Sequence, residues 1–255
     1  ATLSRMVQVT KAAKMYLEEK PSLILTQIQQ TVAQQQKEFE RIYQDILIEL
    51  RKEKIALVNE SQLSEGQKEF VLNYFTETVR THLAPIMIES IPELPLLQDK
   101  SIYLACLLSH TENSFMNSYA LIEVPTHSLS RFVILPSHRG VKCIILLEDV
   151  IRYCMPQLFA QFGFNYFECY VIKMTRDAEL DIDNDVNTDL IASLQKGLKN
   201  RKKGKALRLV YDRTIPKNML HYLVKLLHLG RKENLNPGGR IHNFKDFMEF
   251  PTEIF

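Results

Sequence analysis

This chain of 255 residues has no long hydrophobic run, and that absence excludes several classes of protein. Its uninterrupted apolar stretches, such as residues 143–147, are far shorter than the roughly 18 residues that a membrane-spanning helix needs. Residues 1–16 scatter basic side chains through an amphipathic pattern and lack the apolar block of a signal peptide. With 45% hydrophobic and 24% charged residues, the sequence predicts a soluble, folded, cytoplasmic protein.

Metal, redox and nucleotide-binding motifs are absent as well. The four cysteines are Cys106, Cys143, Cys154 and Cys169. Because they are widely spaced in apolar surroundings, no Cys-x-x-Cys pair occurs, and we expect buried free thiols. Neither a Gly-x-x-x-x-Gly-Lys nor a Gly-x-Gly-x-x-Gly string is present, which excludes a phosphate cradle of those two kinds. The alternating aspartates of residues 181–185 resemble a calcium loop, but Val186 and Ala192 stand where an EF-hand needs glycine and glutamate. We therefore predict no metal site.

The first third of the sequence is patterned as helices. Apolar residues recur at near-heptad spacing from Pro21 to about Asn59, which predicts one long helix. Ser64 followed by Gln67 forms a capping box that predicts the start of a second helix, and residues 1–19 are expected to form a shorter one. Because such amphipathic helices must bury their apolar faces, we expect residues 1–84 to form an antiparallel helical bundle or hairpin.

Prolines at positions 85, 92 and 95 mark a linker over residues 85–100, beyond which the apolar pattern changes to that of β-strands. Strands are predicted at residues 102–108, 119–124, 131–135, 141–147, 166–174 and 206–211, and helices at residues 148–161, 186–200 and 217–228. Pro156 predicts a break in the first of these helices near Tyr153. Residues 101–255 are therefore expected to form a mixed sheet covered by helices, and the fold class to be α+β.

The net charge of +2 excludes a protein that is basic over its whole surface, yet residues 196–205 carry six lysines and arginines. Cations at the end of a predicted helix complement its negative terminus, so a solvated face explains them. Alternatively, Lys199, Arg201 and Lys202 contact a polyanion by replacing its counterions. Arg176, at the end of a predicted strand, either contacts phosphate as well or pairs with Asp177 on the surface.

Four stretches, in this order and spacing, resemble the head domain of polyphosphate kinases of the long phosphohistidine type. They are residues 130–136 (Ser-Arg-Phe-Val-Ile-Leu-Pro), 145–152 (Ile-Leu-Leu-Glu-Asp-Val-Ile-Arg), 171–180 (ending in Thr-Arg-Asp-Ala-Glu-Leu) and 206–216 (Ala-Leu-Arg-Leu-Val-Tyr-Asp-Arg-Thr-Ile-Pro). The resemblance implies an internal fragment that contains the later part of the N-terminal helical domain and the head domain. The phosphohistidine and its magnesium-binding and phosphate-binding partners would lie in C-terminal domains that have no counterpart here.

The resemblance also implies a role. The parent enzyme would transfer the terminal phosphate of ATP reversibly to polyphosphate, with Mg²⁺, and its head domain would take part in homodimer formation. This chain would then be a scaffold and dimerisation unit without catalytic residues or a bound cofactor. Its partners would be a second copy, the C-terminal catalytic domains and, through Arg176, Lys199, Arg201 or Lys202, polyphosphate. Two rival hypotheses are a nucleic-acid-binding module that uses residues 196–205 and a purely structural adaptor that binds neither anion.

Overall fold

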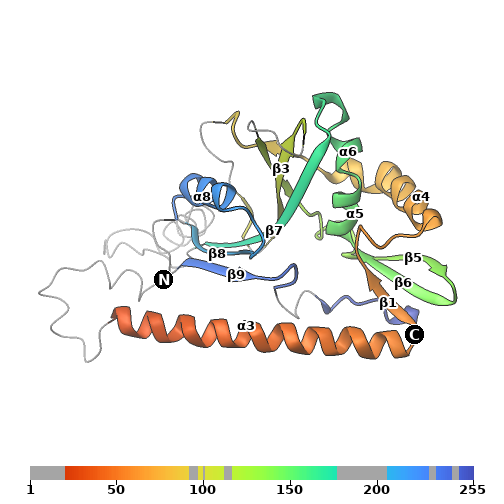
Figure 1. Cartoon of the computed structure of the whole chain (residues 1–255), viewed down its shortest axis with the longest axis horizontal. Helices are drawn as coiled ribbons and strands as arrows, with labels where there is room; N and C mark the ends of the chain where they lie inside the picture. Colours follow the sequence, from red (N-terminus) through yellow and green to blue (C-terminus); the bar gives the residue numbers. More distant parts are fainter. Residues whose placement is uncertain are drawn as a thin grey trace, which may run out of the picture.

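A computed structural model of the chain (Figure 1) describes residues 21–91, 97–99, 101–111, 117–176, 206–229, 234–242 and 247–255. One long helix, α3 (Pro21–Lys52), precedes two mixed sheets and their covering helices, so the predicted α+β class is confirmed. Within the described ranges, no helix is both long and apolar enough to span a bilayer.

The larger sheet has six strands in the order β2-β4-β3-β7-β8-β9. Their bounds are β2 (Ile86–Met87), β3 (Ile102–Ser109), β4 (Ser118–Glu123), β7 (Tyr166–Arg176), β8 (Ala206–Asp212) and β9 (Leu235–Gly238). Neighbouring strands are antiparallel except β8 and β9, which are parallel. Side chains alternate across the sheet, so Leu104 and Cys106 pack into one core cluster while Tyr103 and Ala105 pack into another. Helix α8 (Lys217–Leu226) covers the second of these faces, with Met219 fully buried.

The smaller sheet has three strands in the order β1-β6-β5. In it, β1 (Ile55–Val58) runs parallel to β6 (Val141–Leu146), which forms an antiparallel hairpin with β5 (Phe132–His138). Arg139 and Gly140 connect the hairpin, and both have positive φ angles, 51° and 76°, as tight hairpin turns require.

Helices α3 and α4 (Glu65–Tyr74) lie on opposite faces of this smaller sheet. Ile144 faces a cluster that includes Tyr43 of α3, whereas Ile145 faces the cluster that includes Val71 of α4. The expectation that α3 and α4 pack against each other in a bundle is therefore corrected, since the smaller sheet lies between these two helices. The periodicity of each helix identifies its apolar face, but it does not identify what covers that face.

Most of the predicted elements are present. Strands are found at all six predicted places, and the predicted helix break is found between α5 (Leu147–Tyr153) and α6 (Met155–Leu158), where Cys154 leaves the helical conformation before Pro156. The Ser64 amide donates to Gln67 Oε1 at 3.1 Å, as the capping box predicts. The predicted helices over residues 1–19 and 186–200 lie outside the described residues.

The predicted end of the long helix is wrong. The helix was expected to reach about Asn59 but stops at Lys52, because Lys54 adopts a left-handed conformation (φ 58°) and the apolar residues from Ile55 to Val58 pair with β6. The short strands β2 and β9 were not predicted. The division into residues 1–84, 85–100 and 101–255 stays a prediction, although strands from the first and last of these ranges share one sheet.

Candidate functional site

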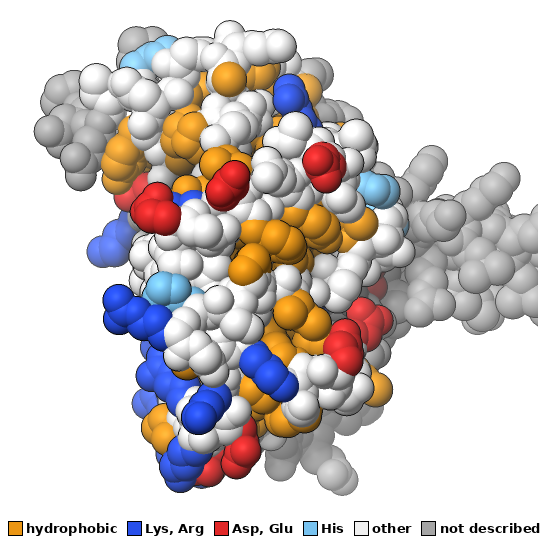
Figure 2. Space-filling view, turned by 90° about the vertical axis from the view of Figure 1, so that its right-hand side faces the viewer, with side chains coloured by type: hydrophobic (Ala, Val, Ile, Leu, Met, Phe, Trp, Pro, Cys, Tyr) orange, Lys and Arg blue, Asp and Glu red, His pale blue; other side chains and the backbone are white. Residues whose placement is uncertain are grey.

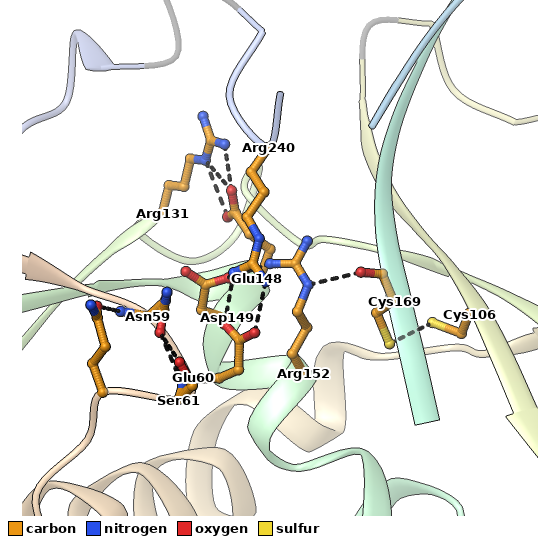
Figure 3. A network of polar contacts seen from close by, with 11 residues as sticks. Asn59, Glu60, Ser61, Cys106, Arg131, Glu148, Asp149, Arg152, Cys169 and Arg240 are labelled. Carbon is orange, nitrogen blue, oxygen red and sulfur yellow. Dashed lines mark hydrogen bonds and ion pairs between the residues drawn. The ribbon is translucent and has the colours of Figure 1, made fainter. Parts of the chain in front are cut away.

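A network of charged side chains, most of them buried or half-buried, lies where the two sheets meet (Figure 3). Its members are Glu60, Arg131, Glu148, Asp149, Arg152 and Arg240. Three of them lie on helix α5, whose first turn carries both carboxylates near the positive end of the helix dipole. The others come from the turn after β1, the residue before β5 and the segment after β9, so the network joins segments that are far apart in the sequence.

Arg131 and Glu148 form the deepest pair of the network. The Arg131 Nε atom donates to both carboxylate oxygens of Glu148, at 3.1 and 3.2 Å, and its Nη2 atom also donates to Oε1. The two side chains are only 5% and 1% exposed. The Arg131 guanidinium also lies 6.0 Å from the centre of the Phe247 ring. A guanidinium and a carboxylate that are this well matched hold β5 to α5.

Arg152 and Arg240 both bind Asp149, from two sides. Arg152 Nη1 donates to Asp149 Oδ1, and Arg152 Nε donates to the carbonyl of Cys169 on β7 at 3.1 Å. Arg240 makes a two-pronged contact with Glu60, at 2.8 and 2.9 Å, and its Nη1 atom lies 3.5 Å from Asp149 Oδ1. Helix α5 is therefore tied to β7 and to the turn that follows β1.

The electrostatics of the network differ from residue to residue. Burial, together with the charges of Glu148 and Glu60, raises the pKa of Asp149 to about 7, although Arg152 and Arg240 oppose that rise. The hydrogen bond to Glu60 raises the pKa of Arg240, which stays charged. The charge of Asp149 therefore changes near neutral pH.

Two cavities border the network. One, of about 490 Å³, lies between α3, β1 and the segment after β9, and Tyr43, Leu57 and Asp149 line it. The other, of about 270 Å³, is lined by residues that include Glu60, Cys169 and Asp212. Arg152 and Arg240 line both cavities. Carboxylates accompany the arginines in each wall, so neither lining is uniformly positive.

Comparisons with known proteins identify the family. A family model described as "Polyphosphate kinase middle domain" matches residues 66–250, which is most of the chain. The chain belongs to the polyphosphate kinase family. The resemblance that the four sequence stretches predicted is therefore confirmed.

Similar polyphosphate kinases come from several bacteria. The polyphosphate kinase of Vibrio parahaemolyticus serotype O3:K6 is 39% identical over 234 residues, which cover 90% of this chain and 33% of that protein. The Escherichia coli K12 polyphosphate kinase is 36% identical over 233 residues, with the same coverage. The crystal structure of the Porphyromonas gingivalis polyphosphate kinase superposes with a TM-score of 0.72 at 26% identity, covering 98% of this chain and 35% of that one. The chain thus spans about a third of the length of the polyphosphate kinases that it matches.

The side chains of the site residues predicted from the sequence fall outside the part of the chain that the structure describes. Arg176 is the last residue of β7, in register with Ala206 of β8, and its side chain lies outside the described part of the structure. Lys199, Arg201 and Lys202 also lie outside it, so their contact with a polyanion stays a prediction. On the face that Figure 2 shows, lysine and arginine side chains gather toward the lower left, and acidic side chains are mixed among them.

Sequence reasoning missed the charged network as a site, although a signal was present. Glu148, Asp149 and Arg152 interrupt an otherwise apolar stretch, and Arg131 directly precedes an apolar strand. Charged residues in such surroundings are either buried in pairs or mark an element boundary. The sequence alone does not show that the carboxylate for Arg131 lies 17 residues further along the chain.

Proposed function

We propose that this chain is a non-catalytic scaffold and dimerisation portion of a polyphosphate kinase, which transfers the terminal phosphate of ATP reversibly to a growing polyphosphate chain. The match to the family's middle domain over residues 66–250 carries the proposal. The charged network supports it, because Arg131, Arg152 and Arg240 each bind a carboxylate of this same chain. Arginines that are engaged in this way connect structural elements and are less available to bind phosphate.

The chemistry of the reaction would come from other domains of the parent enzyme. ATP and Mg²⁺ would bind there, and the phosphohistidine would form there. Phosphoryl transfer depends mostly on positioning and charge stabilisation, so a domain without a nucleophile still contributes by holding the catalytic domains and the two subunits in place. We place this enzyme in the cytoplasm, where ATP is available.

A domain exchange tests the scaffold role. The matching third of the Vibrio parahaemolyticus polyphosphate kinase would be replaced by this chain, and polyphosphate synthesis from ATP would be measured. The exchanged enzyme should make polyphosphate, whereas the same enzyme with the segment deleted should not. An exchanged enzyme that folds, as judged by circular dichroism and gel filtration, but makes no polymer would overturn the proposal. Polymer synthesis by the 255-residue chain alone would contradict its non-catalytic role.

Sedimentation velocity tests the dimerisation role. The 255-residue chain should sediment as a dimer whose population grows with protein concentration. If the chain remains monomeric at every concentration although the exchanged enzyme is active, the dimerisation role is wrong and the scaffold role alone is kept.

Arg176, Lys199, Arg201 and Lys202 are proposed to line a passage for polyphosphate. A triple charge reversal of Lys199, Arg201 and Lys202 to Glu should weaken the binding of labelled long-chain polyphosphate, and binding should fall as salt is raised, because cations release the counterions of a polyanion. A charge reversal of Lys37, Lys52 and Lys68 to Glu provides a matched control. Equal affinity of the two variants for polyphosphate, or binding that does not change with salt, would contradict the proposed contact between these residues and polyphosphate. No finding favours the nucleic-acid alternative, and RNA serves here as the competitor, which should displace polyphosphate poorly.

A further inference from the structure

Two cysteine thiols lie side by side on the two central strands of the larger sheet. Cys106 on β3 and Cys169 on β7 are direct partners in the antiparallel register, and their sulfur atoms lie 3.3 Å apart (Figure 3). Direct partners in an antiparallel pair have Cα atoms about 4.5–5.5 Å apart, within the range of about 4.4–6.8 Å that disulfides span. A bond would need the sulfur atoms to approach to about 2.05 Å, a shift that side-chain rotation and a small strand adjustment can supply.

The two thiols differ in their surroundings, which gives them different roles. Cys169 is half-buried and lines the cavity of about 270 Å³, together with Arg152 and Arg240. A small oxidant that enters this cavity meets Cys169 first, because Cys169 and not Cys106 lines its wall. Cys106 is fully buried, and burial raises the pKa of its thiol well above the ordinary value, with Cys169 adding to that rise. Cys106 therefore stays protonated and out of reach of the oxidant until Cys169 has reacted.

We propose that Cys169 and Cys106 form a peroxide-sensitive thiol pair, in which Cys169 is oxidised and Cys106 resolves it to a disulfide between β7 and β3. In the first step, the Cys169 sulfur attacks hydrogen peroxide, the O–O bond breaks, and a sulfenic acid and one water form. In the second step, the Cys106 sulfur attacks the Cys169 sulfur and the S–O bond breaks. The leaving hydroxyl takes the Cys106 proton as a second water. Two thiols and one peroxide thus give one disulfide and two waters, and a dithiol reductant reverses the change.

The link would join the two central strands of the larger sheet. It would also close a covalent loop between β3 and β7 that contains β4, β5, β6 and α5. This loop includes the β5–β6 hairpin of the smaller sheet and most residues of the charged network. Cys169 contributes its carbonyl to Arg152 as well, so oxidation takes place directly beside the network. This thiol pair is independent of the proposed role in polyphosphate synthesis.

Peptide mapping of the wild-type chain tests the proposal without any substitution. The 255-residue chain would be treated with hydrogen peroxide, alkylated, and digested with trypsin and Glu-C under non-reducing conditions. Glu-C is needed because Cys154 and Cys169 share a tryptic peptide, which cleavage after Glu168 separates. We expect one major crosslinked peptide pair, Cys106 with Cys169, which dithiothreitol removes. Both thiols remaining free, a crosslink to Cys143 or Cys154, or only a sulfinic acid at Cys169 would each overturn the proposal.

Three variants separate the two roles. Cys106→Ala should accumulate a sulfenic acid at Cys169 that dimedone traps, whereas Cys169→Ala should protect Cys106 from peroxide. The control variant Cys143→Ala/Cys154→Ala should form the crosslink as the wild-type chain does. If Cys106 were oxidised at the wild-type rate in folded Cys169→Ala, the assigned order of reaction would be wrong.

Discussion

The buried pair of Arg131 and Glu148 allows a sharp test of how the charged network stabilises the fold. Glu148→Gln keeps the volume of the side chain but removes its charge, so the buried ion pair with the Arg131 guanidinium, which is 5% exposed, is lost. Removal of one partner from a buried ion pair costs about 3–5 kcal/mol of unfolding free energy. At about 2–4 °C per kcal/mol for a chain near this size, the melting temperature should fall by roughly 6–20 °C.

Urea denaturation provides the assay for this prediction. Far-ultraviolet circular dichroism is the suitable probe, because the chain contains no tryptophan for fluorescence. The double variant Arg131→Met/Glu148→Leu should recover most of the lost stability, since it replaces both charges of the buried pair with apolar side chains. Glu38→Gln is the matched control, because its pair with Arg41 is exposed and the urea midpoint should not move. A midpoint for Glu148→Gln equal to that of the wild-type chain, or a double variant no more stable than the single one, would refute the reasoning.

Three further predictions concern other parts of the fold. The pKa of Asp149 in the folded protein, about 7, lies above the ordinary value of 3.8. Protonated Asp149 therefore contributes fully to the free energy of unfolding below about pH 4, and this contribution is lost as pH rises through 7. Relative to Asp149→Asn, the wild-type chain should therefore lose up to about 4 kcal/mol of unfolding free energy between pH 4 and 8, and a constant difference across urea titrations in that range would contradict the assignment. Gly140→Ala should cost about 1 kcal/mol because φ is 76° there, whereas Gly66→Ala in open space on α4 should gain about 0.5 kcal/mol, so thermal melts that shift in the same direction would be unexpected. Gln67→Ala should cost about 1–3 kcal/mol in urea denaturation, because the buried side chain donates to the Pro136 carbonyl at 2.9 Å, and a neutral result would show that water replaces that bond.

The sequence predicted the structural features that depend on interactions between residues close together in the chain. The strands β3 and β6 follow from continuous apolar runs, and the break at Cys154 follows from the missing amide of Pro156. The capping box of α4 likewise depends on residues only three positions apart. These features need no knowledge of distant partners.

Features that depend on distant partners could not be predicted in the same way. The strand Ile55–Val58 continues a helical pattern in the sequence, and only its pairing with residues 142–145 makes it a strand. Strand β9 contains Pro237, which argues against a central strand and is accommodated here because β9 is at the edge of the sheet. The network around Asp149 was missed for the same reason, since Glu60 and Arg240 approach it from opposite ends of the sequence.

The parallel pairing of β1 with β6 has a practical consequence for anyone who shortens this protein. The span matched by the family model starts at residue 66 and ends at residue 250, so a recombinant version trimmed to it would lack β1, α3 and the C-terminal turn. The backbone amide and carbonyl groups along one edge of β6 would then be unpaired and could bind a strand of another molecule. Ile144 and Leu146 would also be exposed, because Tyr43 and Ile254 would no longer cover them. Such a trimmed protein should precipitate or form fibrils, so the boundary of sequence similarity is a poor place to cut this molecule.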